Sequence, residues 1–266
     1  MFYIVFLAVF FLFISLIFSM FGLGGGLAYV SLLVLVGYTV KTASIISLFA
    51  ILLASFSAFS IFFKSGRFDW KLAALIDPPT DIMAFVGGYY ANLLPEIVLT
   101  VILVAMVLLA GMLTIRRVEF KRAGKGGKFV WRRGFKGEVY TVNIPLTCLM
   151  TGVVGFFVGM IGATGGIFKI PIMVLLCGVP IEIAVGTSSG MVFLTALFAL
   201  IGHLTTAKMV NWLTIIPVGV ACLLGGIIGA RISIKARRET IRNTYGVLMF
   251  VIALIIVVRK LINPII

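Results

Sequence analysis

Charged residues are scarce in this sequence: Asp, Glu, Lys and Arg make up 11% of its 266 residues, and 62% are hydrophobic. A soluble domain has about a quarter charged and about half apolar residues. Many windows of about 20 residues hold no charge, and this is the length that a helix needs to cross a bilayer. The scarcity excludes an ordinary soluble domain and predicts an all-α polytopic protein of the cell membrane.

Residues that carry catalytic and metal chemistry are also few. The chain has one histidine, His203, and its three cysteines (Cys148, Cys177 and Cys222) lie inside apolar stretches. A single histidine makes no zinc motif, the cysteines form no CxxC pair, and no Walker A sequence is present. We therefore expect no metal, no cofactor and no disulfide framework. A membrane-embedded enzyme would need a nucleophile or a metal constellation, so we expect no enzyme.

Acidic residues are outnumbered, with 8 against 22 basic ones and a net charge of +14. Nine basic residues lie within 116–136 and five within 231–242, beside apolar runs. Basic loops next to spans follow the positive-inside rule and attract anionic lipid headgroups. This placement predicts a cytoplasmic linker that contacts anionic lipid through residues 116–136. It argues against a nucleic-acid partner, and a homodimer is left open.

Glycines interrupt two of the apolar runs at places 140 positions apart. Gly22-Leu23-Gly24-Gly25-Gly26 divides the run 2–36, and Gly162-Ala163-Thr164-Gly165-Gly166 divides the run 142–177. With slight drift the flanks repeat as well: Met20 and Met160, Gly37 and Gly178, Ser47 and Ser188, Gly87 and Gly229. The chain is therefore predicted to contain two copies of one membrane unit, residues 1–115 and 141–266, joined by the basic linker 116–140.

Each copy is predicted to hold a glycine-broken pair of segments followed by three full spans. The expected segments are 2–21, 27–36, 44–63, 70–90 and 97–115, then 141–161, 167–177, 184–203, 212–230 and 241–258. The second piece of each pair reaches only ~15–18 Å, so it must be a short helix or the returning arm of a hairpin inside the membrane. The first segment has a counterpart in the second copy, so we expect it to belong to the fold and not to a cleaved signal peptide.

Loop charges favour opposite orientations for the two copies. The loop leading into Trp70 is basic, whereas the one before Trp212 has only Lys208. The loop after residue 230 is basic, whereas residues 92–96 contain no Lys or Arg. The positive-inside rule then predicts inverted-topology repeats with eight to ten membrane segments. Two basic residues, 259 and 260, would lie on the wrong side, so a parallel four-plus-four arrangement stays open.

The glycine breaks are the first candidate binding site, comprising Gly22, Gly24, Gly25 and Gly26 in one copy and Gly162, Thr164, Gly165 and Gly166 in the other. A broken helix exposes backbone N–H groups at its new N-terminus, where the helix dipole attracts an anion. Paired glycine-interrupted segments in two halves are typical of a transporter's binding site. The alternative is close helix packing through small residues.

Charged residues inside apolar runs are the second candidate site. Lys169 lies three residues after Gly166, and an intramembrane charge is a functional hypothesis by default. The alternatives for Lys169 are snorkelling to the interface or pairing with an acid. Asp77 and Asp81 flank two prolines in the span 70–90 and share one helix face. They would pair with Lys169, balance the charge of the site or carry a proton for coupling; the alternative is a kinked helix end with solvated acids.

Hydroxyl residues occupy matching places at the start of the next spans. Ser47 in the first copy and Thr187 with Ser188 in the second are candidate donors to an anion's oxygens. The alternative is interhelical hydrogen bonding, which is common for Ser and Thr in membranes.

Three features recur in both halves: a Gly-rich break, a Ser/Thr stretch, and Asp-Trp or Asn-Trp followed by a span with glycine. In the second half they end in Val210-Asn211-Trp212 and then Gly225-Gly226-Ile227-Ile228-Gly229-Ala230. Their order and duplication resemble the sulfite exporter TauE/SafE family of membrane anion permeases over nearly the whole chain except the linker. The breaks and Thr187-Ser188 match the repeated motifs of that family. The stretch from Asp77 to Asp81 departs from its pattern, in which this span is more apolar.

The resemblance implies a secondary transporter of a small anion, either a sulfur-containing one such as sulfite, thiosulfate or an organosulfonate, or a carboxylate. Together with the breaks, it leads to the hypothesis of an anion permease working by alternating access. The anion would be held near the midplane by Lys169, backbone N–H groups and the hydroxyls. Two alternatives remain open: a passive anion channel built from the same glycines, and a non-transporting scaffold that acts through the basic linker.

Overall fold

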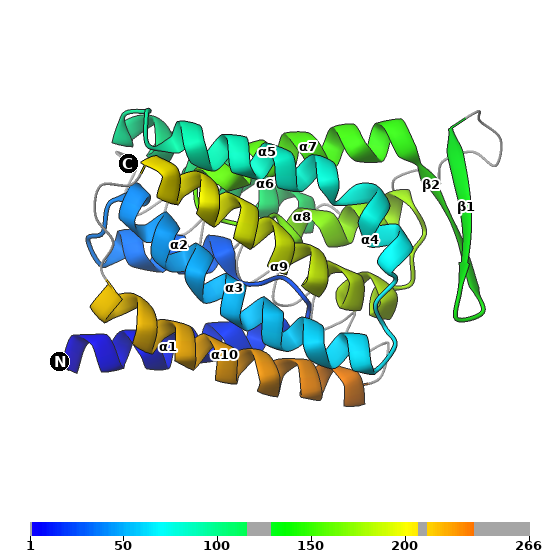
Figure 1. Ribbon diagram of the computed structural model, residues 1–266, viewed down its shortest axis with the longest axis horizontal. Helices are drawn as coiled ribbons and strands as arrows, with labels where there is room; N and C mark the ends of the chain where they lie inside the picture. Colours follow the sequence, from blue (N-terminus) through cyan, green and yellow to red (C-terminus); the bar gives the residue numbers. More distant parts are fainter. Residues whose placement is uncertain (1, 116–128, 207–211, 237–266) are drawn as a thin grey trace.

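A computed structural model describes residues 2–115, 129–206 and 212–236 of the chain. Residues 116–128 of the expected linker and the expected last span, 241–258, lie outside the described residues. The helices, shown in Figure 1, are α1 (Phe2–Ser19), α2 (Gly26–Leu35), α3 (Val40–Lys64), α4 (Trp70–Ile76), α5 (Pro78–Ala91), α6 (Glu96–Ile115), α7 (Ile144–Met160), α8 (Gly166–Pro171), the π-helical turn η1 (Ile172–Leu176), α9 (Ile181–Thr206) and α10 (Trp212–Lys235).

The predicted first interruption separates α1 from α2. Gly22, Gly24 and Gly25 all have φ between 62° and 77°, the left-handed region that residues with a Cβ rarely adopt. Helix α1 therefore ends at Ser19, and α2 begins with Gly25 as its N-cap. The chain turns here because glycine alone adopts this backbone at little cost.

The second interruption has the same form. Helix α7 ends at Met160, Gly162 has φ 70°, and Gly165, with φ 67°, is the N-cap of α8. Helix α8 is short because Pro171 has no backbone N–H to donate. The chain continues as the π-helical turn η1, so the segment from Gly166 to Leu176 is one apolar helical segment with an irregular second part.

The described chain is mostly helical, and three of its helices are long and apolar enough to cross a membrane by length and composition: α3, α9 and α10. The expected span 70–90 is divided into α4 and α5. Asp77 separates them, and Pro78 follows as the first residue of α5, a position where its missing N–H costs no intrahelical hydrogen bond. The structure thus has a full helix boundary where the sequence predicted a single span.

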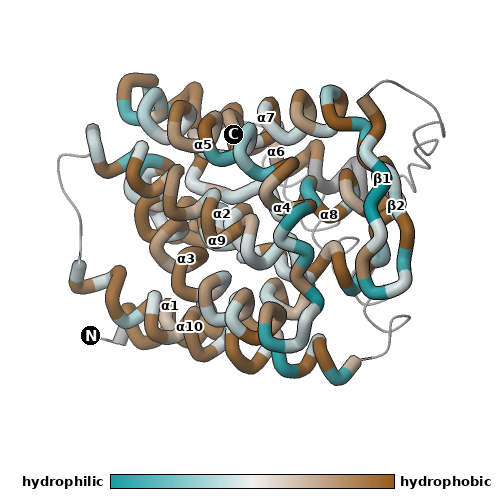
Figure 2. Tube along the Cα trace, turned by 45° about the vertical axis from the view of Figure 1, so that its right-hand side comes forward, coloured by the Kyte–Doolittle hydropathy of each residue, from teal (hydrophilic) through white to brown (hydrophobic). Residues whose placement is uncertain are grey.

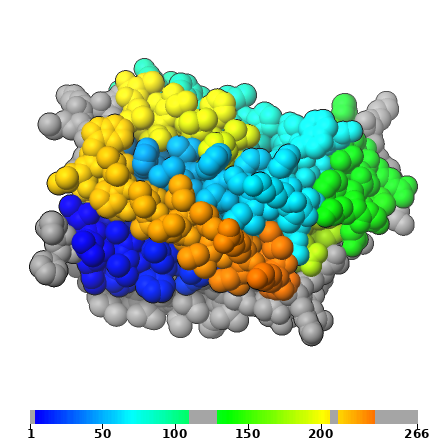
Figure 3. Space-filling model, turned by 60° about the horizontal axis from the view of Figure 1, so that its bottom comes forward, coloured from blue at the N-terminus to red at the C-terminus, as the bar shows by residue number. Residues whose placement is uncertain are grey.

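The helices of one half pack mainly on those of the other. Helix α1 lies along α10, and α7 lies along α5 (Figure 1). Gly87 of α5 faces the Phe156 carbonyl of α7, where an added Cβ would lie 2.2 Å away. Gly229 of α10 faces the Leu16 carbonyl of α1 at the same 2.2 Å. In Figure 3, α10 (gold to orange) lies between α1 (blue) and α3 (light blue). Equivalent glycines therefore make equivalent contacts with the halves exchanged.

Helices α3 and α9 run in opposite directions, and so do α4 and α10. Arg67, just after the end of α3, donates to the Ile234 carbonyl near the end of α10 at 2.9 Å. Asp69, just before α4, donates its N–H to Thr187 near the start of α9 at 3.1 Å. Because residues 67 and 69 are close in the chain, the end of α3 also lies near the start of α9, and the start of α4 also lies near the end of α10. Figure 1 shows the same opposition for α1 and α7.

A β-hairpin corrects the expectation of an all-α chain. Strands β1 (Val130–Phe135) and β2 (Glu138–Asn143) pair antiparallel beyond one end of the helices. Lys136 and Gly137 form the turn, with φ 52° and 80°, as a two-residue type I′ turn requires. The hairpin begins in the expected linker and runs past its boundary at residue 140. Figure 2 shows hydrophilic residues on the hairpin and at the helix ends, while the helices are largely hydrophobic.

Candidate functional site

The two glycine breaks lie against each other. A Cβ added to Gly26 would lie 2.9 Å from the Cα of Ala163, and one added to Gly166 would lie 2.9 Å from the Cα of Leu23. Leu23 and Ala163 are 140 positions apart, as are Gly26 and Gly166, so this is one contact made twice. The structure therefore brings the two breaks into direct contact.

A small cavity lies between the breaks. Leu23, Gly26 and Leu27 line it from one side, and residues 163–168 line it from the other. Its volume of about 10 Å³ is enough for about one water molecule. The buried hydroxyl of Thr164, one of the lining residues, has no hydrogen-bond partner among the described residues. Helices α2 and α8 both begin here, and the first turn of a helix presents N–H groups without intrahelical partners.

Two of the three expected hydroxyl donors hold the backbone of the breaks. Ser188 donates to the Gly22 carbonyl at 2.8 Å, and Ser47 donates to the Gly26 carbonyl at 3.3 Å. The third, Thr187, contacts a different segment: its hydroxyl oxygen accepts a hydrogen bond from the Asp69 N–H. In this conformation these hydroxyls fix the shape of the site, and Thr164 is the hydroxyl that lines its cavity.

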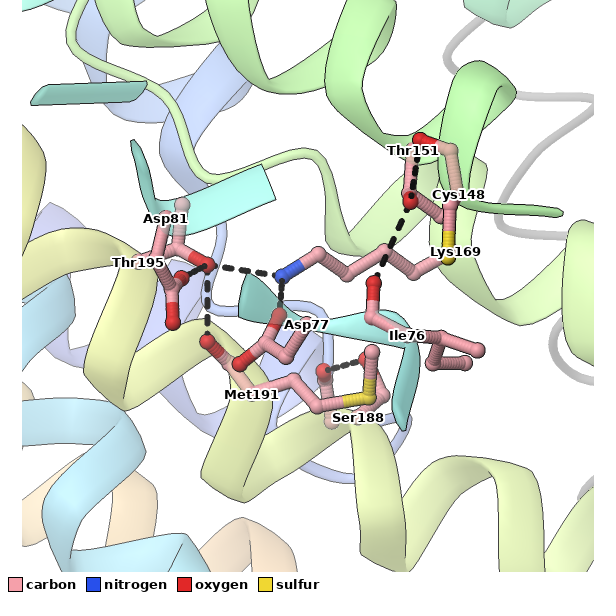
Figure 4. A network of polar contacts seen from close by, with 10 residues as sticks. Ile76, Asp77, Asp81, Cys148, Thr151, Lys169, Ser188, Met191 and Thr195 are labelled. Carbon is pink, nitrogen blue, oxygen red and sulfur yellow. Dashed lines mark hydrogen bonds and ion pairs between the residues drawn. The ribbon is translucent and has the colours of Figure 1, made fainter. Parts of the chain in front are cut away.

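Lys169 forms a buried charge cluster with Asp77, Asp81 and Thr195 (Figure 4). Its Nζ donates to Asp77 Oδ1 at 2.5 Å and to Thr195 Oγ1 at 2.7 Å. The Thr195 hydroxyl lies 2.6 Å from Asp81 Oδ1 and joins the second carboxyl to the lysine. Lys169 is 0% exposed, Asp77 2% and Asp81 6%, so the cluster is shielded from solvent. Two alternatives were considered for Lys169, snorkelling to the interface and pairing with an acid, and the structure shows the pairing.

Thr195 is the member of this cluster that sequence reasoning missed. It lies seven residues after Ser188, two helical turns along α9, and therefore on the same face. This spacing from Ser188, a candidate residue, is the sequence signal that could have identified Thr195.

The first half has no charged residue at the position equivalent to Lys169. Tyr29, the counterpart of Lys169, is fully buried and stacks on Phe11 with ring centroids 4.5 Å apart. Its hydroxyl lies 3.6 Å from Cys222 Sγ. The breaks are thus alike in backbone but different in chemistry.

A second polar cluster fastens the hairpin to the helices. The Asp69 carboxylate caps α4 by accepting from the Lys71 N–H at 3.0 Å. It also accepts from Arg133 Nε at 3.0 Å and from the Tyr140 hydroxyl. Burial alone would raise the pKa of Asp69, but hydrogen bonds from Arg133, Tyr140 and the Leu72 N–H outweigh burial and hold this pKa below its usual value. Sequence reasoning missed this cluster, because its members lie far apart in the chain.

The Asp69→Asn variant is expected to be less stable than the wild type by about 2 kcal/mol near neutral pH, since it loses charged hydrogen bonds. The folded-state pKa of Asp69 lies below the unfolded value of about 3.9, so this stability is present above that pH and is lost as pH falls through the folded-state pKa. Thermal unfolding at pH 7, 5 and 3.5 should therefore show a difference that shrinks at the most acidic pH. Glu138→Gln, in the same hairpin, is the control; a difference independent of pH would contradict the assignment.

Comparison with known proteins places this arrangement in a family. The model of the family described as sulfite exporter TauE/SafE matches residues 7–256. The probable membrane transporter protein YunE of Bacillus subtilis (strain 168) is 26% identical over 235 residues, which cover 84% of this chain and 86% of that protein. No solved structure matches. The match spans both glycine breaks and the buried charge cluster, and the chain therefore belongs to the sulfite exporter TauE/SafE family of multi-pass membrane transporters.

Proposed function

We propose that this chain is a secondary transporter of a small sulfur-containing, sulfonate or carboxylate anion, and that the anion binds between the two glycine breaks. The observation that carries the proposal is the cavity where the breaks meet. Two helices begin at it, and helix N-termini attract anions through their N–H groups and dipole. The Thr164 hydroxyl, buried and without a partner among the described residues, supplies a further donor.

Alternating access is the proposed mechanism. The two halves would be inverted-topology repeats, which accounts for the opposite directions of α3 and α9 and for the exchanged contacts of Gly87 and Gly229. The cavity of about 10 Å³ admits only about one water molecule, so an anion with several heavy atoms enters after the breaks separate. The conformation described here is then a closed one, and rocking of the halves would open it to either side.

The hairpin end of the molecule is proposed to be cytoplasmic. Lys64, Arg67 and Lys71 lie at this end with the hairpin, as does the basic end of α10. The positive-inside rule places such an end in the cytoplasm. Contact with anionic lipid through residues 116–136 stays a prediction, and residues 116–128 lie outside the described residues.

Anion binding is tested with purified protein by thermal stability at one ionic strength. The panel is sulfite, thiosulfate, sulfoacetate, isethionate, sulfate, phosphate and acetate. A ligand at ~100 times its Kd stabilises the folded state by about 2.7 kcal/mol. We expect one class of sulfur anion or carboxylate to stabilise the wild type, and Thr164→Val to bind it roughly tenfold more weakly, because one hydrogen bond to a charged group is lost.

Thr205→Val is the matched control, because Thr205 is exposed near the end of α9 and its hydroxyl bonds to Gly202. Equal binding by Thr164→Val and Thr205→Val would remove Thr164 from the site. No stabilisation by any anion would overturn the proposed site itself. Saturable counterflow in vesicles then separates a carrier from a channel.

A further inference from the structure

Lys169 lies next to the proposed anion site. Phe168 lines the cavity, and Lys169 is the following residue on the first turn of α8. A helix rises only ~1.5 Å per residue, so the backbone of Lys169 lies within about one turn of the cavity. Its side chain is directed to Asp77 and Thr195 in the closed conformation (Figure 4). A long, flexible lysine side chain therefore has two anionic partners within reach: a carboxylate and a bound anion.

The charge cluster is not balanced by its own members. Two carboxylates and one ammonium sum to a charge of −1 when all are ionised. Asp77 Oδ2 is buried and has no hydrogen-bond partner among the described residues. A buried carboxylate without partners costs free energy, so Asp77 would need a proton as soon as the Lys169 ammonium left it.

Other titratable groups on the surrounding helices face elsewhere. On α9, His203 lies eight residues after Thr195, and its Nε2 bonds to the Gly159 carbonyl of α7 at 2.8 Å. On α7, Cys148 bonds to the Leu75 carbonyl at 3.7 Å. Lys169 from α8 and Asp81 from α5 are thus the ionisable side chains that face Asp77 within the described part of the chain.

Resting on the proposed anion site, we propose that the cluster of Lys169, Asp77, Asp81 and Thr195 is a proton-binding site that couples anion transport to proton movement. When an anion enters between the separated breaks, the Lys169 ammonium leaves Asp77 and pairs with the anion. The Asp77 carboxylate then takes one proton from the aqueous side to which the site is open and becomes a neutral carboxylic acid. Anion and proton cross together, and the reverse exchange on the other side releases both.

A proton fits this cluster better than a sodium ion. The Lys169 ammonium, 2.5 Å from Asp77, already occupies the position that a metal cation would take. Thr195 gives a single oxygen that is already bonded to the lysine and to Asp81.

The test counts protons taken up on binding. Isothermal titration of the wild type with sulfoacetate and with isethionate, in buffers of different ionisation enthalpy, gives this number directly. Both anions stay ionised near neutral pH, whereas sulfite would itself exchange protons. We expect uptake of about one proton per anion and an affinity that falls about tenfold per pH unit as pH rises. Asp77→Asn should bind with uptake near zero, whereas Glu138→Gln should behave as the wild type.

The number of protons that the wild type takes up per anion tests the proposal even if Asp77→Asn does not fold. Asp81→Asn is a second variant, which removes the other carboxylate of the cluster. Binding without proton uptake, or binding that requires sodium, would overturn the coupling role and leave the anion site intact. Uptake that persists unchanged in both Asp77→Asn and Asp81→Asn would place the proton elsewhere and overturn the assignment. No binding of any anion in the stability panel would overturn the anion site, and the coupling role with it.

Discussion

Replacing Gly22 with alanine is expected to destabilise the protein by about 3 kcal/mol and to abolish transport. Gly22 has φ +62°, which is strained for any residue with a Cβ. The new methyl would also lie 2.2 Å from the Val185 carbonyl oxygen and 3.2 Å from the Ser189 nitrogen, so backbone atoms would have to move. The measurement is thermal unfolding of the purified variant, with anion uptake into vesicles as the functional readout.

Two other glycines separate the contributions. Gly37 has φ +99°, and no atom of the described residues lies within 4 Å of an added Cβ, so Gly37→Ala should cost only the backbone strain, about 1 kcal/mol. Gly152 lies within α7, and its nearest contact is at 3.7 Å, so Gly152→Ala should be neutral or slightly stabilising. If Gly22→Ala unfolded at the same temperature as Gly37→Ala, close packing of the break against α9 would have no energetic weight.

Replacing Lys169 with methionine is expected to cost about 3 to 5 kcal/mol, because the change leaves buried carboxylates without their ammonium. Anion binding should be lost as well, since the proposed partner of the anion is gone. Thermal unfolding and the anion panel measure the two effects separately. The variant keeps a side chain of similar length, so the loss reflects charge more than volume.

The double variant Lys169→Met with Asp77→Asn tests the pairing. It removes the uncompensated carboxylate, so it should recover most of the stability lost in Lys169→Met, and anion binding should stay absent. Residues in direct contact give strongly non-additive free energies in such a cycle. Costs that simply add would argue that Lys169 and Asp77 act independently, contrary to the 2.5 Å contact between them.

Much of the fold could be predicted because it depends on local patterns in the sequence. Apolar runs, the glycines within them and the 140-residue offset located the two breaks and the helices around them within a few residues. The hairpin was missed because its signal is an alternation over only six residues per strand, next to a strongly basic loop. The turn at Lys136-Gly137 was a further signal, since a glycine there suits the left-handed backbone of a two-residue hairpin turn.

The candidate site could be predicted only in part, for a different reason. Glycines, Lys169 and the two aspartates stand out because they are unusual inside apolar runs. Their partner Thr195 does not stand out, because it is separated from Asp81 by 114 positions. In the second cluster Tyr140 is likewise 71 positions from Asp69. Such contacts depend on which helix of one half lies on which helix of the other, and a single sequence does not contain that arrangement. The same holds for the contact of Ser188, whose hydroxyl donates to the Gly22 carbonyl 166 positions away.

The exchanged packing of the halves has a consequence for biosynthesis. Helix α1 is made first, yet the helix that it lies along is α10, whose Gly229 seats against Leu16. At roughly 5 to 20 residues per second, the ribosome reaches α10 about 10 to 40 s after α1. During that interval the face of α1 that will receive α10 has lipid or an insertion factor beside it. Neither half reaches its final packing before the other is synthesised, so α1 spends those seconds without the helix that it finally lies along.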